Sequence, residues 1–249
     1  MKEMFTDLHT HILPGFDDGA RTVDDALAML QMQKKQGVER VALTPHYYPI
    51  QESLDEFLER RQLAYHSLME KWDADIMPIL RLGAEVCYSP VLAQMDLSKL
   101  TIEKTDYLLL ELPDENVPFG IDEVMHNMLQ QGIIPILAHV ERCAYFRQQP
   151  NRLYDLIQKG ALAQASAATR RCKKDWKFVN ICIRKGLVHI IASDTHRLDM
   201  KPPCLGAVLS NVDINIAQWS EEFAWSVWNN LPAPVFSYRP IKLGLLGYY

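Results

Sequence analysis

The sequence predicts a single-domain α/β protein whose strands form a (β/α) barrel. Seven short apolar runs alternate with longer segments of helical spacing along the 249 residues, which is typical of a parallel sheet covered by helices on both faces. No glycine-rich phosphate loop follows the first run, which disfavours an open doubly wound sheet. No linker or internal repeat divides the chain, and barrels of about 250 residues are commonly one domain.

Each predicted strand is a short apolar run, and each predicted helix places apolar residues three and four positions apart. The predicted strands are Met4–Leu8, Arg40–Thr44, Ile79–Glu85, Tyr107–Leu112, Ile134–His139, Leu162–Ser166 and Val188–Ser193. The predicted helices are Val23–Gln36, Ser53–Trp72, Ile121–Gln131, Arg152–Lys159 and Asp175–Lys185. Glycine follows several of them, at Gly37, Gly132, Gly160 and Gly186. Because glycine readily adopts the left-handed conformation that closes a helix, we expect the helices to end there.

The chain from about residue 231 onward differs from the rest. Pro232, Pro234 and Pro240 interrupt it, and it ends with Tyr248 and Tyr249. We expect a surface extension of the single domain 1–249, either ordered or frayed. A docking or phosphorylation role for the two tyrosines is the alternative.

Composition and charge exclude several classes of protein. Hydrophobic residues make up 48% and charged residues 23%, as in globular rather than disordered or fibrous chains. A net charge of −5 disfavours a basic protein that binds nucleic acid or a membrane surface. No apolar run approaches the roughly 18 residues that cross a bilayer, and the first residues lack the apolar segment of a secretory signal. Five scattered cysteines without a CxxC motif disfavour disulfides and a thiolate zinc site. We therefore expect a cytoplasmic enzyme with no nucleic-acid partner and no membrane insertion.

Polar residues gather where the predicted strands end. These residues are His9, His11, His46, Glu85, Glu111, His139, Glu141, Arg142, Asp194 and His196. In parallel barrels the carboxyl ends of the strands form the catalytic face. Five of the eight histidines fall on this face, whereas His66, His126 and His189 lie elsewhere and are expected to be structural.

The spacing of these residues predicts a metal site. His9/His11 and Asp194/His196 are each two positions apart, so in a strand both members can face one ion. Imidazole and carboxylate together suit zinc, manganese and iron, and a buried carboxylate is rare unless it is paired or bound to metal. One catalytic zinc usually takes three protein ligands, fewer than are present here. The sequence therefore predicts two or three ions that share a carboxylate, and hydrolysis as the chemistry. The alternative is that these are unrelated core and rim residues.

The order of the motifs identifies a family resemblance. The stretch Asp7-Leu8-His9-Thr10-His11-Ile12-Leu13-Pro14-Gly15, followed by Asp17-Asp18-Gly19-Ala20, resembles the polymerase and histidinol phosphatase (PHP) superfamily. More narrowly, it resembles the manganese-dependent tyrosine phosphatases of bacterial capsule and exopolysaccharide loci. Further matches are Thr44-Pro45-His46, Gly83-Ala84-Glu85, Glu111, Ala138-His139-Val140-Glu141-Arg142 and Ala192-Ser193-Asp194-Thr195-His196. Together they extend from about Met4 to about Trp228.

The resemblance implies a distorted, TIM-like (β/α)7 barrel with three metal ions. It implies a first metal held by His9, His11, Glu85 and Asp194, a second held by Glu85, Glu111 and His139, and a third held by Asp18, His46 and His196. Asp18 is assigned by the resemblance alone, since Asp17-Asp18-Gly19 otherwise reads as a turn that leads into a helix. Mn²⁺ is the expected metal, with iron or zinc as alternatives.

The resemblance also implies hydrolysis of phosphotyrosine by metal-activated hydroxide, with the tail of a bacterial tyrosine kinase of polysaccharide synthesis as the expected substrate. Arg142 is expected to neutralise phosphate oxygens, because a guanidinium matches them in a two-pronged geometry. Lys201 stands near the position where related enzymes usually carry arginine, so it keeps the charge but loses the fork. Asp199 or His46 could donate a proton to the leaving group. The segment from Gln164 to Ala168 also departs from a stretch typically richer in asparagine.

Three other functions stay open at this point. One is a small-molecule phosphomonoesterase of the same fold, such as a histidinol phosphatase. The second is an amidohydrolase-type metal hydrolase, although Glu111 takes the place where those enzymes commonly use a modified lysine. The third is a non-enzymatic barrel that keeps its metal sites as a regulatory or binding module.

Overall fold

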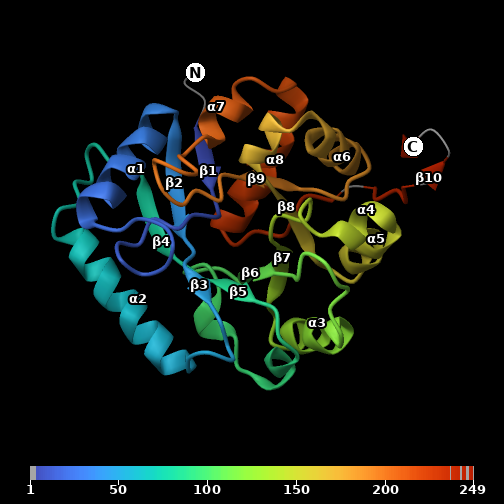
Figure 1. Ribbon diagram of the computed structural model, residues 1–249, viewed down its shortest axis with the longest axis horizontal. Helices are drawn as coiled ribbons and strands as arrows, with labels where there is room; N and C mark the ends of the chain where they lie inside the picture. Colours follow the sequence, from blue (N-terminus) through green and yellow to red (C-terminus); the bar gives the residue numbers. More distant parts are fainter. Residues whose placement is uncertain (1–3, 236, 242, 245–246, 249) are drawn as a thin grey trace.

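Parallel strands in the middle of the molecule are surrounded by helices, which confirms the predicted mixed α/β class (Figure 1). The computed structural model describes residues 4–235, 237–241, 243–244 and 247–248. Its parallel strands are β1 (Phe5–Asp7), β2 (Val38–Leu43), β3 (His46–Tyr47), β4 (Ile79–Leu82), β5 (Glu85–Cys87), β6 (Tyr107–Glu111), β7 (Ile134–Leu137), β8 (Leu162–Ser166) and β9 (Ile190–Ala192). The α-helices are α1 (Val23–Lys35), α2 (Leu54–Met69), α3 (Ile121–Gln130), α4 (Ala144–Gln148), α5 (Asn151–Gln158), α6 (Lys173–Arg184), α7 (Leu205–Leu209) and α8 (Ile214–Trp228). Three 3-10 helices are η1 (Pro90–Gln94), η2 (Ser98–Leu100) and η3 (Ala167–Arg171).

The strands form two parallel sheets, ordered β1-β2-β4 and β3-β5-β6-β7-β8-β9. The predicted strand Ile79–Glu85 is divided into β4 and β5, and β2 is followed directly by β3. Pro45, which has no N–H to donate to a ladder, stands between β2 and β3. Hydrogen bonds from Gly83 N to Leu43 O (2.8 Å) and from Glu85 N to Pro45 O (3.0 Å) nevertheless continue the pairing across both interruptions.

The helices begin and end where local chemistry favours it. Thr22 and Ser53 cap α1 and α2, each in a reciprocal pair with an acidic residue three positions later. The four glycines expected to end helices have positive φ angles, from 70° at Gly186 to 108° at Gly160. Helix α8, which the apolar spacing did not indicate, is a further finding.

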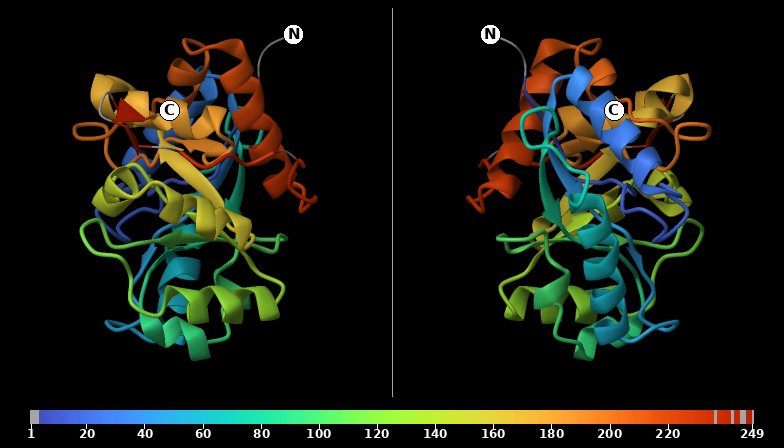
Figure 2. Two further views of the ribbon diagram at one scale, coloured as in Figure 1. Left: turned by 90° about the vertical axis from the view of Figure 1, so that its right-hand side faces the viewer. Right: turned by 90° about the vertical axis from the view of Figure 1, so that its left-hand side faces the viewer.

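Helix α8 covers the amino-terminal ends of the strands. Its residues Phe223, Val227 and Trp228 join a buried cluster with inward-facing strand residues such as Tyr107, the first residue of β6. The Tyr107 hydroxyl also donates to Leu231 O, just after α8 (2.8 Å). The side views place α8 on the side of the molecule opposite the loop that follows β1 (Figure 2). The carboxyl ends of the strands are therefore the ends left open for a site.

The proline-rich extension is partly tied to the domain. Arg239 N donates to Lys185 O (2.9 Å), the Ile241 side chain is buried, and β10 (Leu243–Gly244) pairs antiparallel with β11 (Gly247–Tyr248). Tyr249 and the side chain of Tyr248 lie outside the described residues, so the expectation for these tyrosines is untested. No helix in the described part of the chain is long and apolar enough to cross a membrane.

The Glu221 carboxyl makes a testable contribution to stability. It accepts hydrogen bonds from Thr6 N and Thr6 Oγ1 (both 2.8 Å), and burial raises its pKa to about 7. The folded protein therefore binds this proton more tightly than the unfolded chain does, so the contribution is full at low pH and is lost as pH rises to about 7. We expect the melting temperature of Glu221→Gln, relative to wild type, to rise by several degrees between about pH 5 and about pH 8. Thermal melts of Glu222→Gln, an exposed neighbour on α8, should show no such change. A constant difference for Glu221→Gln would contradict the prediction.

Candidate metal centre

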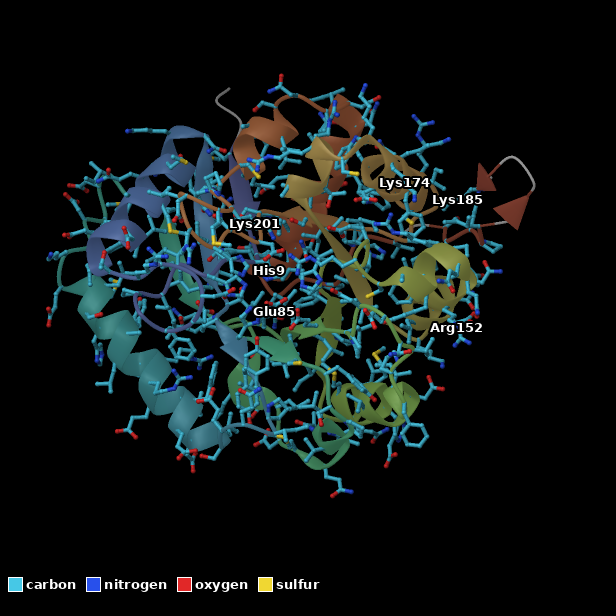
Figure 3. The ribbon with its side chains drawn as sticks, viewed as in Figure 1. His9, Glu85, Arg152, Lys174, Lys185 and Lys201 are labelled. Atoms are coloured by element: carbon cyan, nitrogen blue, oxygen red, sulfur yellow. The ribbon has the colours of Figure 1, made fainter. Side chains whose placement is uncertain are left out.

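The nine residues predicted as metal ligands lie at or beyond the carboxyl ends of β1, β2, β4, β6, β7 and β9, with His46 and Glu85 each three residues after the end of β2 and β4. They are His9, His11 and Asp18 after β1, His46 at the start of β3, Glu85 at the start of β5, Glu111 at the end of β6, His139 after β7, and Asp194 and His196 after β9. In the view of Figure 3, His9 and Glu85 lie in the middle of the molecule, with side chains from distant parts of the chain around them. The fold thus brings all nine residues to one place.

The first group is a triangle of ligand atoms. His9 Nε2 and His11 Nε2 are 3.1 Å apart, and each is 3.2 Å from Glu85 Oε2. Two ligands about 2.1 Å from one ion, at tetrahedral or octahedral angles, stand about 3.0–3.4 Å apart. Asp194 Oδ1 completes the group at 3.6 Å from His9 Nε2 and 3.8 Å from His11 Nε2. The spacing matches atoms that share one cation.

Buried polar atoms without hydrogen bonds support the same interpretation. Glu85 Oε2, Asp194 Oδ1 and His46 Nδ1 are buried and have no hydrogen-bond partner among the described residues. A buried polar atom without a partner is costly, and here two carboxylate oxygens and one imidazole nitrogen of this kind face the same cluster. Imidazole nitrogens and carboxylate oxygens of this kind are the donors that divalent transition metals take. The residues present therefore fit a metal.

A second group surrounds the other face of Glu85. His139 Nε2 lies 2.9 Å from Glu85 Oε1 and 3.4 Å from Glu111 Oε1. His46 Nδ1 lies 3.1 Å from Glu85 Oε2 and 3.9 Å from Glu111 Oε2. The Glu85 carboxylate thus stands between the first and second groups, as expected for a shared ligand.

A third group lies toward the solvent. Asp18 Oδ1 is 3.4 Å from His196 Nε2 and 3.7 Å from His46 Nε2, and the Asp18 side chain is 69% exposed. The ligand atoms of His11, Asp18, His46 and His196 all come within 4.8 Å of one another. His46 belongs to both the second and the third group, because its two ring nitrogens face opposite ways. Sequence reasoning, which placed it in the third alone, did not anticipate this double contact.

Two residues that sequence reasoning missed orient the histidines. His11 Nδ1 is hydrogen-bonded to Asp17 Oδ2 (2.8 Å), which also accepts from His46 N (3.1 Å). His9 Nδ1 is hydrogen-bonded to Gln164 Oε1 (3.2 Å), which also accepts from His139 N (2.8 Å). Such outer partners fix which ring nitrogen offers its lone pair to a metal. The signal for Gln164 was its place in the predicted strand Leu162–Ser166, and for Asp17 its place beside Asp18.

Arg142 and Lys201 meet at the remaining oxygen of Asp194. Arg142 Nη2 donates to Asp194 Oδ2 (2.8 Å), and Lys201 Nζ donates to the same oxygen. The Arg142 side chain is 39% exposed and that of Lys201 is 19% exposed, so both are accessible beside the cluster. Asp199, one of the two candidate proton donors, is hydrogen-bonded to Arg197 at the surface instead.

Electrostatic interactions within the cluster shift several pKa values. Burial alone would raise the pKa values of Glu85 and Asp194, but His9 and its cationic neighbours hold both below their usual range. Burial opposes protonation of His139, yet Glu111 and Glu85 raise its pKa to about 10. Burial and the nearby His11 lower the pKa of His196 to about 4. The carboxylates of Glu85 and Asp194 therefore stay anionic, and their negative charge must be balanced by cations nearby.

The backbone is strained where the ligands are presented. His139 and Asp194 have positive φ angles of 28° and 50°, which residues other than glycine rarely adopt. Gly19 passes so close to His11 that a Cβ would lie 1.8 Å from His11 O. Strain of this kind persists where the surrounding structure fixes it, typically at functional sites.

The three remaining histidines lie away from the cluster. His66 on α2 is hydrogen-bonded to Gln62, and His126 is exposed on α3. His189 lies just before β9 rather than inside a strand, and its Nδ1 accepts from Ala163 N (3.0 Å). These contacts agree with structural roles.

Comparison with known proteins gives the family. The model of the family described as "Capsular polysaccharide synthesis, CpsB/CapC" matches residues 5–223. Tyrosine-protein phosphatase YwqE of Bacillus subtilis (strain 168) is 29% identical over 208 residues, which are 77% of each chain. Tyrosine-protein phosphatase CpsB of Streptococcus pneumoniae is 28% identical over 213 residues, 79% of this chain and 85% of the relative.

Solved structures with a similar fold include a relative from the same group of phosphatases. One from a study of YwqE from Bacillus subtilis and CpsB from Streptococcus pneumoniae, described as unique metal-dependent tyrosine phosphatases, superposes with a TM-score of 0.82 at 26% identity. It covers 95% of this chain and 99% of the other. A phosphotriesterase homology protein from Escherichia coli, at 11% identity and a TM-score of 0.50, covers 88% of this chain and 96% of its own and is similar in fold alone. With the motif order of the sequence and the family match over residues 5–223, these findings establish that the chain belongs to the CpsB/CapC family of capsular polysaccharide synthesis.

Proposed function

We propose that this protein is a metal-dependent protein-tyrosine phosphatase that hydrolyses phosphotyrosine in proteins. The observation that carries the proposal is the convergence of His9 Nε2, His11 Nε2 and Glu85 Oε2 at 3.1–3.2 Å, in a chain of the CpsB/CapC family. Curated relatives named as tyrosine-protein phosphatases support the choice of substrate class. We further propose that the enzyme acts in the cytoplasm, on a protein substrate such as the tail of a bacterial tyrosine kinase. It would have no nucleic-acid partner.

The cluster would hold two or three divalent ions, with Mn²⁺ favoured and iron or zinc as alternatives. His9, His11, Glu85 and Asp194 would hold the first ion. Glu85, Glu111 and His139 would hold the second, and Asp18, His46 and His196 would hold the third. When bound, such ions polarise phosphoryl oxygens and lower the pKa of water. The mixed nitrogen and oxygen donors accept several metals, so availability also decides which is bound.

The chain's own residues would bind and orient the phosphoryl group. Arg142 can present two N–H groups to phosphate oxygens, whereas Lys201 offers a point charge. Lys201 is held in place through its backbone, because its carbonyl accepts from His196 N (3.1 Å) and from Thr195 Oγ1 (2.7 Å). Both cations now share Asp194 Oδ2, so a phosphate oxygen would compete with that carboxylate oxygen for them.

We further propose that the two sheets form one distorted (β/α)7 barrel within a single domain spanning residues 1–249, with the extension from about 231 on its surface. The hydrogen bonds of Gly83 and Glu85 link β4 and β5 to the strand before them. A parallel bridge between Thr10 and Thr195, with His11 N donating to Thr195 O (2.9 Å), brings the end of β9 beside the end of β1. These contacts favour a continuous ring of strands.

An activity panel tests the function. With manganese added, we expect the protein to hydrolyse a phosphotyrosine peptide in preference to histidinol phosphate, and to leave a cyclic amide intact. Phosphate release would be measured for the esters and ring opening for the amide. A preference for histidinol phosphate would reassign the substrate class, and hydrolysis of the amide alone would exclude a phosphatase. Metal analysis of the protein as isolated would identify the ion.

Arg142→Ala should separate phosphate binding from metal binding. Removing the guanidinium leaves all nine proposed ligands, so metal content should stay unchanged while kcat/KM for a phosphotyrosine peptide falls about 10²–10³-fold. Lys201→Arg, which restores the fork, should keep or raise kcat/KM. Loss of bound metal in Arg142→Ala would instead make Arg142 a structural partner of Asp194.

Asp17→Asn should weaken metal binding without unfolding the protein. The asparagine keeps the size of the side chain but removes the charge beside His11 Nδ1, and loss of such an outer partner typically costs 10–100-fold in metal affinity. Titration of Mn²⁺ by calorimetry would measure it, with Asp24→Asn on the exposed surface of α1 as the matched control. Equal affinities for the two variants would remove Asp17 from the site.

A further inference from the structure

A surface of unpaired positive charge runs along α6. Residues 170–185 contain seven of the 26 lysines and arginines but only one acidic residue, Asp175. Arg170, Lys173, Lys177 and Arg184, named here the basic ridge, are exposed. In a protein of net charge −5, this concentration of cations is a local exception.

The ridge borders a groove. Lys173, Lys177 and Arg184 are spaced by four and seven positions, which places them on one side of the helix. With Arg170 they line a groove of about 350 Å³. Trp176 forms part of this groove, is only 7% exposed, and has the Arg170 guanidinium 5.6 Å from its ring centroid.

The charge of the ridge is not neutralised by acidic side chains in the part of the chain that the structure describes. None of its four cations forms an ion pair with an acidic side chain of the described residues, and no acidic residue is among those described as lining the groove. Asp175, the one acid on α6, is paired with Arg147. An anionic ligand would therefore meet these cations without displacing a protein carboxylate.

Hydrogen bonds connect the segment just before the ridge to the residue that precedes Arg142. Ser166 N and Thr169 Oγ1, at the end of β8 and in η3, donate to Glu141 Oε1 (3.0 and 2.7 Å). Glu141 directly precedes Arg142, whose side chain contacts Asp194. Helix α6 starts just after η3, and Lys174 and Lys185, at its two ends, both lie apart from His9 and Glu85 (Figure 3). Its 12 residues span about 18 Å, the length of five or six extended residues.

We propose that the basic ridge docks an acidic segment of the protein substrate while the neighbouring phosphotyrosine occupies the metal centre. This inference rests on the proposed function and adds a substrate preference, namely several negative charges on one side of the phosphotyrosine. A concave groove with a buried tryptophan suits a peptide better than a flat lipid surface, because membrane-binding faces insert exposed apolar side chains. The net charge of −5 disfavours a long nucleic acid.

Paired peptides and paired variants test the docking. Two phosphotyrosine peptides would differ only in carrying five glutamates or five glutamines on one flank, each flank orientation being made separately. Lys173→Gln/Lys177→Gln would be compared with Lys35→Gln/Lys99→Gln, which removes the same charge from exposed positions on α1 and η2. p-Nitrophenyl phosphate, which has no flank, reports the chemistry alone.

In wild type and in the Lys35/Lys99 control we expect kcat/KM to be roughly tenfold higher for one orientation of the acidic peptide than for its glutamine counterpart at low salt. The preference should fall toward one in Lys173→Gln/Lys177→Gln and in about 0.5 M salt, with p-nitrophenyl phosphate turnover unchanged. Equal rates for both peptides in wild type, or a preference kept by the ridge variant, would overturn the proposal.

A binding assay separates this proposal from the proposed function. A fluorescein-labelled, unphosphorylated peptide with five glutamates should bind the manganese-loaded protein with a Kd about fivefold lower than that of the ridge variant, whether or not the protein hydrolyses phosphotyrosine. Absence of that difference would refute the docking even in an active phosphatase. If phosphatidylserine vesicles, and not the peptide, bind in a ridge-dependent way, the surface is a lipid site and the peptide proposal fails.

Discussion

The carboxylate of Glu85 is the constraint on which the rest of the site depends. Imidazole nitrogens of His9, His11, His46 and His139 approach its two oxygens to between 2.9 and 3.2 Å, and its side chain is 1% exposed. A buried ion is costly unless other charges and hydrogen bonds compensate it. Because one of its oxygens lacks a hydrogen-bond partner among the described residues, the histidines alone do not satisfy it. Shared cations would satisfy Glu85 and would also direct the four imidazoles toward common points.

The fold allows this convergence because the two ends of the strands differ: one end is covered by α8 and the other carries the polar side chains. At one end, α8 seals the interior with Phe223, Val227 and Trp228. At the other end, every ligand except Asp18 lies in a strand or within four residues of one, and His46 and Glu85 are the first residues of β3 and β5. The register that pairs His46 with Glu85 and Cys87 with Glu111 sets these side chains next to each other. Stability and chemistry thus use different ends of the same strands.

Much of the site follows from local sequence rules, and the exceptions have a physical cause. His9 and His11 reach one point, as a period of two predicts, although both lie beyond the end of β1 at Asp7. For Asp194 and His196 the rule holds only in part, because Asp194 leaves strand geometry at φ 50° and His196 Nε2 turns to Asp18.

Contacts across the fold lay beyond such rules. Gln164 joins His9, 155 positions away in sequence, to His139, 25 positions away, and no local pattern encodes that pairing. The contacts of the two ring nitrogens of His46, with Asp18 and with Glu85, depend on the positions of neighbouring loops. Helix α8 was missed for a different reason: its buried face includes Ala217 and Ser220, so apolar spacing alone marks it weakly.

The balance of charges around the centre connects the proposed metal ions with the basic side chains beside them. Five carboxylates, Asp17, Asp18, Glu85, Glu111 and Asp194, face the centre, against the side chains of Arg142 and Lys201 and the imidazoles of His11 and His139, whose pKa values nearby carboxylates raise. These side chains alone give the mouth no excess of positive charge to attract a phosphate dianion. Under the proposed function, two divalent ions would give the mouth a net positive charge, so they would help to bind the phosphate as well as to activate it. Because salt screens charges beyond a short Debye length, ions at the centre would act weakly on an approaching polypeptide, and the exposed basic ridge on α6 would add positive charge farther out.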